Sequence, residues 1–234
     1  MSAGWWRRRT RRLLVNPSLR RLMPAGARRS ANAVVSLAAT SAWLAEAGPM
    51  TIWPDRAQLY AAVLDAEQHD EPLDYLEFGV SRGASIRWWS DSLVHPDTAL
   101  VGFDTFEGLP ERWGSVASGT YTADGKVPDL DDARATFVVG LFQETLPGWL
   151  AQAELARRVI VHLDADLYSS TLFVLTSLAP HLKPGDVLVF DEFGSVRNAA
   201  DEFRAFADFT AAYRWRYEPI GATTAYKQVA LRLC

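Results

Sequence analysis

The chain has 234 residues, of which 49% are hydrophobic and 22% are charged, enough to bury a full core in one catalytic-sized domain with an extension. Its single cysteine, Cys234, excludes an intramolecular disulfide and a cysteine-based zinc site, so any metal would be held by oxygen ligands. Nine of the 24 Lys and Arg residues precede the first acid, Glu46, and the remaining 15 face 28 acids, a balance of −13 that argues against a nucleic-acid-binding surface there.

Residues 1 to about 30 form an arginine-rich segment without acids that also contains Trp5 and Trp6. Such a segment is typical either of a surface arm that contacts anionic lipid, a polyanion or a partner, or of a solvated tail, and the sequence leaves both open. An export signal is disfavoured, because the mildly apolar stretch 31–45 contains several Ser, Thr and Asn residues. No run approaches the ~18 apolar residues of a membrane span, and we expect a cytoplasmic protein.

A domain boundary is predicted near residue 48, where Gly48-Pro49 interrupts the chain. This divides the chain into an N-terminal extension, 1–47, and one catalytic domain, 48–234. The residues that follow Trp53 predict an amphipathic helix, because their apolar side chains recur at helical spacing.

The stretch LDYLEFGVSRGAS, residues 73–85, predicts a buried strand, a sharp turn at Gly79 and Gly83, and a helix. Such a strand-to-helix turn exposes unpaired N–H groups and can hold a ligand. The dinucleotide fingerprint needs a third glycine, which is missing, and the carboxylate of Glu77 would repel a pyrophosphate. We infer a ligand with a nucleoside and an amino-acid end, which describes S-adenosylmethionine; an ordinary strand-helix connection is the alternative.

Apolar strand-like runs alternate with helical or loop segments along the rest of the chain. The runs lie at 73–79, 99–104, 137–141, 159–165 and 187–192. Two further strands are expected to form a closing antiparallel hairpin around Gly221. We therefore expect an α/β protein with a Rossmann-like, doubly wound, mostly parallel seven-stranded sheet and an antiparallel C-terminal hairpin.

Four of these runs lead from apolar residues into a carboxylate, at Glu77, Asp104, Asp164 and Asp191. The carboxyl ends of parallel strands share one edge of the sheet, so we expect the four acids to converge on one crevice. Converging acids raise one another's pKa and require a compensating cation. A sulfonium ion, ribose hydroxyls and a divalent metal would together satisfy them, whereas a single strand-end acid is usually a turn or helix cap.

Asp104 stands about two dozen residues after Glu77, where an acid that binds both ribose hydroxyls is expected. A turn aspartate is the alternative. The long polar loop that follows, between Trp113 and Asp132, is typical of a lid.

The segment 140–147 would lie beside the purine, where Phe142 offers aromatic contact and Gln143 an amide. Phe142 as a core residue and Thr145 as a helix N-cap are the equally open alternatives.

Asp164, Asp191 and Glu192 make an all-oxygen ligand set suited to magnesium or calcium. Asp166 lies two residues beyond Asp164 and either joins this set or caps a loop.

With these segments, the sequence resembles the macrocin O-methyltransferase family, within the class I S-adenosylmethionine-dependent methyltransferases. The resembling segments follow the family's order: DRAQLY, LEFGVSRGAS, VGFDTFEGLP, GLFQETLP, HLDADLYSST, GDVLVFDEF and AADEFRAF. The resemblance implies a Rossmann-like fold with strand order 3-2-1-4-5-7-6, methyl transfer to a sugar or related hydroxyl, and a magnesium-dependent site.

The resemblance also assigns the site. It places the amino-acid end of the cofactor at Glu77, Gly79, Ser81 and Gly83, with Ser85 just beyond, the ribose at Asp104, and the metal at Asp164, Asp191 and Glu192.

Two departures from the family's pattern bear on the chemistry. The family often has paired aspartates where this chain has Asp191-Glu192, which lengthens one ligand arm. No histidine near the C-terminus could serve as an additional base. His162 lies in an apolar strand and is expected to belong to the core.

The hypothesis from sequence is direct transfer of an activated methyl group to a metal-bound hydroxyl of a small molecule, with Asp164 or a neighbouring acid accepting the proton. The alternatives are metal-independent transfer to nitrogen or carbon on the same fold, or a non-catalytic domain that docks through the arginine-rich segment. A nicotinamide dehydrogenase is disfavoured by the missing glycine. Association into homo-oligomers would be compatible with aromatic patches around Trp88, Trp89 or Trp149.

Overall fold

The structure, a computed structural model, describes residues 35, 38–67, 71–194 and 201–234. The arginine-rich segment at residues 1 to about 30 lies outside the described residues, as does any membrane or polyanion contact it would make. None of the helices in the described ranges has the length and apolarity needed to span a bilayer.

A single sheet contains all eight strands of the described chain, in the order β1-β7-β8-β6-β5-β2-β3-β4. The strands are β1 (Ile52–Trp53), β2 (Leu73–Phe78), β3 (Ala99–Asp104), β4 (Ala135–Val139), β5 (Arg158–Leu163), β6 (Val187–Phe190), β7 (Tyr217–Thr223) and β8 (Val229–Leu233). Strands β2 to β6 pair in parallel, and β8 is antiparallel to both β6 and β7.

This topology confirms the predicted mostly parallel sheet, the order of its seven main strands and the antiparallel C-terminal hairpin. The difference is an eighth strand, the two-residue β1, which pairs in parallel with β7 at the edge of the sheet. Its two residues are too few to produce a periodic pattern, and the partner that fixes them is far along the chain.

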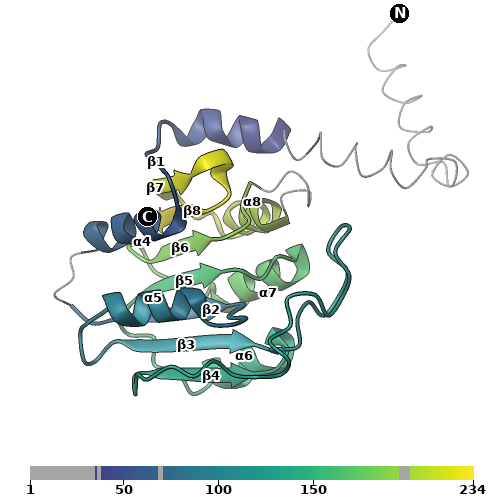
Figure 1. Ribbon diagram of the computed structural model, residues 1–234. Helices are drawn as coiled ribbons and strands as arrows, with labels where there is room; N and C mark the ends of the chain where they lie inside the picture. The colour runs from purple at the N-terminus through teal and green to yellow at the C-terminus, as the bar shows by residue number, and fades with distance from the viewer. Residues whose placement is uncertain (1–34, 36–37, 68–70, 195–200) are drawn as a thin grey trace, which may run out of the picture.

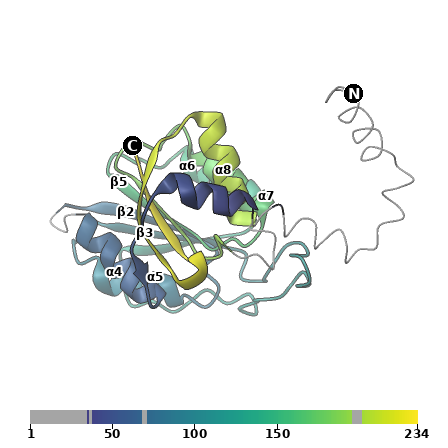
Figure 2. The same ribbon diagram turned by 90° about the horizontal axis from the view of Figure 1, so that it is seen from above.

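Helices cover both faces of the sheet (Figures 1 and 2). The helices are α4 (Arg56–Ala66), α5 (Ala84–Ser92), α6 (Phe142–Leu150), α7 (Tyr168–Leu178) and α8 (Asp201–Tyr213). Helices α4 and α5 pack on one face, and α6, α7 and α8 pack on the other. All six residues of β2 are buried, as expected for a central strand covered on both faces.

A helix over residues 38–47 precedes the predicted domain boundary and packs on the α8 side of the core. Its Trp43 is only 6% exposed, and its ring lies 5.0 Å from that of Phe193 and 6.5 Å from that of Phe206. The indole Nε1 of Trp43 donates a hydrogen bond to the hydroxyl of Tyr217, at 2.8 Å. This helix therefore contributes a side chain to the core of the domain, and the boundary near residue 48 stays a prediction.

The turn of the C-terminal hairpin comes later in the chain than predicted. Gly221 lies inside β7, and the turn is made by a short 3-10 helix, Thr224–Tyr226, and the residues up to β8. A Cβ on Gly221 would lie 2.8 Å from Nε1 of Trp53, and the pairing with β8 shifts between Pro219 and Gly221. The glycine therefore serves close packing within an irregular strand, which explains why the prediction of a turn at Gly221 was wrong.

Candidate active site

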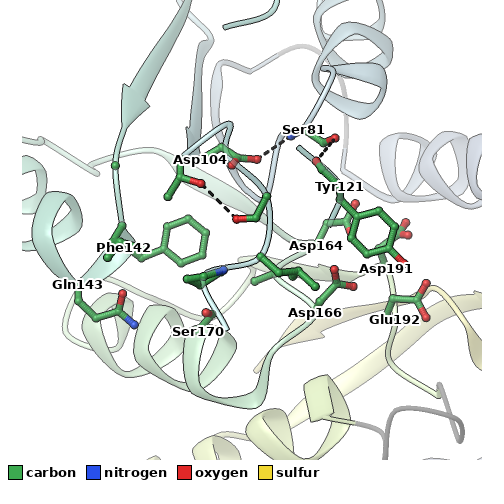
Figure 3. A pocket seen from close by; sticks show the side chains of 18 of the residues that line it. Ser81, Asp104, Tyr121, Phe142, Gln143, Asp164, Asp166, Ser170, Asp191 and Glu192 are labelled. Atoms are coloured by element: carbon green, nitrogen blue, oxygen red, sulfur yellow. Dashed lines mark hydrogen bonds between the residues drawn. The ribbon is translucent and has the colours of Figure 1, made fainter. Parts of the chain in front are cut away.

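A cavity of about 350 Å³ lies at the edge of the sheet where the parallel strands have their carboxyl ends (Figure 3). Its walls come from the segments that follow β2, β3, β4, β5 and β6, together with the loop between β3 and β4 and the turn between β7 and β8. Three of the four strand-end acids, Asp104, Asp164 and Asp191, line the predicted crevice, whereas Glu77 does not, so the predicted convergence of all four was wrong for Glu77.

The turn after β2 lies against the start of the segment that follows β5. Gly79 has a φ of +99°, and a Cβ there would lie 2.0 Å from the backbone oxygen of Asp164. Only a glycine permits this approach. The turn then continues to Ser81, and both Gly79 and Ser81 line the cavity as predicted.

Asp104 also lines the cavity, and its carboxylate is fixed by two backbone donors. The N–H of Ser81 donates to Oδ2 and the N–H of Phe106 donates to Oδ1, both at 2.7 Å. The contact with Phe106 is that of a turn aspartate, and the contact with Ser81 joins β3 to the turn after β2. The turn interpretation of Asp104 therefore has a contact in its support, the ribose interpretation stays a prediction, and each carboxylate oxygen can still accept a further hydrogen bond.

Phe142 and Gln143 lie at the start of α6 and line the cavity on the side away from Asp191 and Glu192 (Figure 3). The ring of Phe142 also packs edge-on against Phe78, with ring centroids 5.5 Å apart, so it contacts both the core and the cavity. Thr145 is not the N-cap of this helix, because α6 already begins after Leu141 and the hydroxyl of Thr145 donates back to the carbonyl of Leu141.

Three of the predicted cofactor residues do not line the cavity: Glu77, Gly83 and Ser85. Gly83 caps the start of α5 with a φ of +77°, and a Cβ there would meet Pro128 at 2.8 Å. Ser85 is buried within α5. Their predicted contacts with a cofactor stay predictions.

Glu77 is buried on the α4 and α5 face of the sheet. The hydroxyl of Tyr75 donates to Glu77 Oε2 at 2.5 Å and lies 2.7 Å from Nδ1 of His162, whose Nε2 is 3.3 Å from the hydroxyl of Tyr60. Burial raises the pKa of Glu77 to about 8 and lowers the pKa of His162 to about 4. His162 is therefore a neutral core residue, which confirms the prediction from sequence.

Four carboxylates gather on one side of the cavity: Asp164, Asp166, Asp191 and Glu192 (Figure 3). Burial, then the charges of Asp191 and Asp166, raise the pKa of Asp164 well above its usual value. Burial and the charge of Glu192 raise the pKa of Asp166 to about 7. The cluster thus carries more negative charge than its surroundings balance.

The donor types of this cluster fit a hard divalent cation, because all are carboxylates. Asp191 is buried, and its Oδ1 has no hydrogen-bond partner, as expected of an oxygen that a ligand completes. Within the described ranges, however, no three His, Cys, Asp or Glu side chains are arranged to hold one metal ion. The chemistry of the predicted triad fits magnesium, and the side chains do not converge as they lie.

Two charged residues that sequence reasoning missed complete the cluster. The Nζ of Lys227 lies 2.9 Å from Glu192 Oε1 and lines the cavity, although the residue belongs to the turn between β7 and β8. Glu202 is fully buried at the start of α8, and its Oε2 accepts from the backbone N–H of Glu192 at 2.9 Å. An acid on the apolar stripe formed by Phe203, Phe206 and Phe209 was the signal for Glu202; no sequence pattern marks Lys227.

The loop between β3 and β4 includes the predicted lid, residues 113–132. Tyr121 lines the cavity, and its carbonyl accepts from the hydroxyl of Ser81 at 3.4 Å. The backbone N–H groups of Ala123 and Gly125 both donate to the carbonyl of Phe106, at 3.0 Å. The loop is thus tied to the residues that follow β3, directly beside Asp104.

Comparison with known proteins finds similar O-methyltransferases. Residues 116–215 match the model of the macrocin O-methyltransferase family. Over these residues, less than half of the chain, the sequence is similar to this family. A rhamnosyl-tetracenomycin-C 4'-O-methyltransferase of Streptomyces olivaceus is 32% identical over 160 residues, 57% of this chain and 58% of that protein. A mycinamicin III 3''-O-methyltransferase of Micromonospora griseorubida is 34% identical over 159 residues, 57% of this chain and 61% of that protein. The chain thus matches less than two thirds of either relative.

Solved structures of related fold cover more of the chain. The calicheamicin methyltransferase CalS11 is 21% identical with a TM-score of 0.57, covering 97% of this chain and 90% of that one. The O-methyltransferase NovP is 23% identical with a TM-score of 0.55, covering 75% and 79%. At these identities, the likeness shows that the fold is shared.

Proposed function

We propose that this chain is an S-adenosylmethionine-dependent O-methyltransferase that acts on a hydroxyl of a small molecule, a sugar or a glycosylated natural product, with assistance from a divalent metal. The observation that carries the proposal is the cavity that joins the glycine turn after β2, Asp104 and the carboxylate cluster at one sheet edge. The family supports the reaction type, and the names of relatives that act on rhamnosyl tetracenomycin and mycinamicin support the substrate class.

S-adenosylmethionine would supply the activated methyl group. The turn at Gly79 and Ser81 would hold its amino-acid end, and Asp104 would accept hydrogen bonds from the ribose hydroxyls. Phe142 and Gln143 would border the purine from α6. In this arrangement, the chain positions the methyl group at the side of the cavity that faces the carboxylates.

A divalent metal would lower the pKa of the acceptor hydroxyl, and Asp164, Asp191 and Glu192 would hold it. Asp164 would accept the proton of that hydroxyl. Its raised pKa makes it a stronger base than an ordinary aspartate once it is ionised. Because the backbone of Asp164 lies against the turn that would hold the cofactor, the base and the methyl group would act on the same acceptor oxygen.

The test compares Asp164→Asn with Asp124→Asn, the same change at an exposed loop position outside the cavity. Formation of S-adenosylhomocysteine is measured with a panel of rhamnosides and other deoxysugar glycosides, and binding of S-adenosylhomocysteine by calorimetry. We expect Asp164→Asn to lose about a hundredfold or more of turnover while cofactor affinity stays within a few fold. Normal turnover in Asp164→Asn, with Asp124→Asn also normal, would refute the role of Asp164.

Metal-independent methyl transfer, to nitrogen or carbon in place of oxygen, is the second candidate. It is favoured by the observation that no three acids in the described part of the chain are arranged to hold one ion. Turnover measured in a chelator and again after addition of Mg²⁺ separates the two: loss and recovery support metal assistance, and undiminished turnover supports the second candidate.

A further inference from the structure

Lys227 is a cation beside the predicted metal ligands, and none of the site assignments explains it. It follows the short 3-10 helix between β7 and β8, and its Nζ lies 2.9 Å from Glu192 Oε1 and 3.9 Å from Asp191 Oδ2. The side chain is 52% exposed, so solvent reaches it, yet it also lines the cavity. One ammonium group thus faces two adjacent carboxylates at the end of β6.

The other oxygen of Asp191 has a cation at the same distance and no closer partner. Its Oδ1 lies 3.9 Å from Nη1 of Arg56 and accepts no hydrogen bond. Of the two carboxylates, Glu192 therefore makes the shorter ion pair with Lys227, and Glu192 has the longer side chain. A glutamate can direct its carboxylate toward Lys227 while the shorter Asp191 stays against the sheet.

We propose that the ammonium of Lys227 occupies the cation position of Glu192 and Asp191 and competes with the divalent metal for these two carboxylates. The inference rests on the metal-assisted part of the proposed function. Two cations held by the same carboxylate oxygens repel each other, so a metal bound there displaces Lys227 from Glu192.

The experiment measures binding of Mn²⁺ to the full chain by electron paramagnetic resonance, at constant ionic strength and without substrate. Lys227→Gln removes the charge, and Lys227→Arg retains it. Lys183→Gln is the matched control, because Lys183 donates to the carbonyl of Ala156 at the opposite edge of the sheet and lines no part of the cavity. Thermal unfolding of each variant checks that it is folded.

We expect Lys227→Gln to bind Mn²⁺ about tenfold more tightly than the unchanged chain, since one nearby positive charge is removed. Lys227→Arg and Lys183→Gln should bind within about twofold of it. Unchanged or weaker binding by Lys227→Gln would overturn this inference and leave metal-assisted transfer standing. Absence of Mn²⁺ binding in all four proteins would overturn both this inference and metal-assisted transfer. The chelator experiment on turnover tests metal assistance alone.

Discussion

Buried acidic side chains at the two ends of the parallel strands differ in how closely cations pair with them. At the edge where β5 begins, the buried side chain of Glu67 is held between Arg158, at 2.5 Å, and Arg232, at 2.7 Å. At the opposite edge, the equally buried Asp191 has its nearest cationic nitrogens, from Arg56 and Lys227, at 3.9 Å. Both acids are removed from water, but only Glu67 is fully paired. The comparison teaches that the first edge is built for stability, and that the cavity edge keeps negative charge available for a ligand.

The largest expected effect concerns Glu77, a third buried acid, which lies on the α4 and α5 face of the sheet and lines no part of the cavity. Its pKa in the folded chain, about 8, is above the ordinary value of 4.5, so its contribution to stability is full below about pH 4.5 and is lost as the pH rises toward 8. Glu77→Gln should remove this loss and gain roughly 2–4 kcal/mol relative to the unchanged chain between pH 5 and pH 9.

Urea unfolding of both proteins as a function of pH measures this difference. Tyr75→Phe is the matched variant, because it removes the hydrogen bond to Glu77 and keeps the acid. If Glu77→Gln shows the same pH dependence as the unchanged chain, the pH dependence of stability originates elsewhere in the molecule.

The paired edge is tested by Arg158→Met. This change leaves Glu67, whose side chain is 2% exposed, with only one of its two short ion pairs, and should cost about 2–3 kcal/mol of unfolding free energy. Arg204→Met breaks the more exposed pair with Asp201 and should cost less than about 1 kcal/mol. Equal losses measured by urea unfolding would contradict the special role of the Glu67 pair.

At the cavity, the loss of one charged side chain should not lower the stability of the protein. Asp191→Asn removes a buried, poorly compensated charge and should leave stability unchanged or raise it by about 1 kcal/mol, while methyl transfer falls. Thermal unfolding and turnover, measured on the same preparation, report the two effects. A large loss of stability in Asp191→Asn would show that this acid is structural, like Glu67.

The sequence predicted the main sheet because five long apolar runs alternate with helical segments, and it predicted the cavity because three of those runs end in Asp104, Asp164 and Asp191. It could not place Glu77. β2 is buried on both faces, so apolar and polar residues do not alternate in a way that tells which face the side chain of Glu77 occupies. Lys227 reaches the cavity only through the pairing of β8 with β6, and such long-range pairing leaves no local pattern.

The contact of Trp43 with Phe193 and Phe206 has a practical consequence for trimming this chain. Removal of residues 1–47 would take the indole of Trp43 out of its cluster with Phe193 and Phe206. It would also leave the hydroxyl of Tyr217 without its donor. A shortened version that begins between residues 30 and 37 keeps Trp43 and lacks all nine early arginines. Such a version would separate what the arginines do from what the indole holds together.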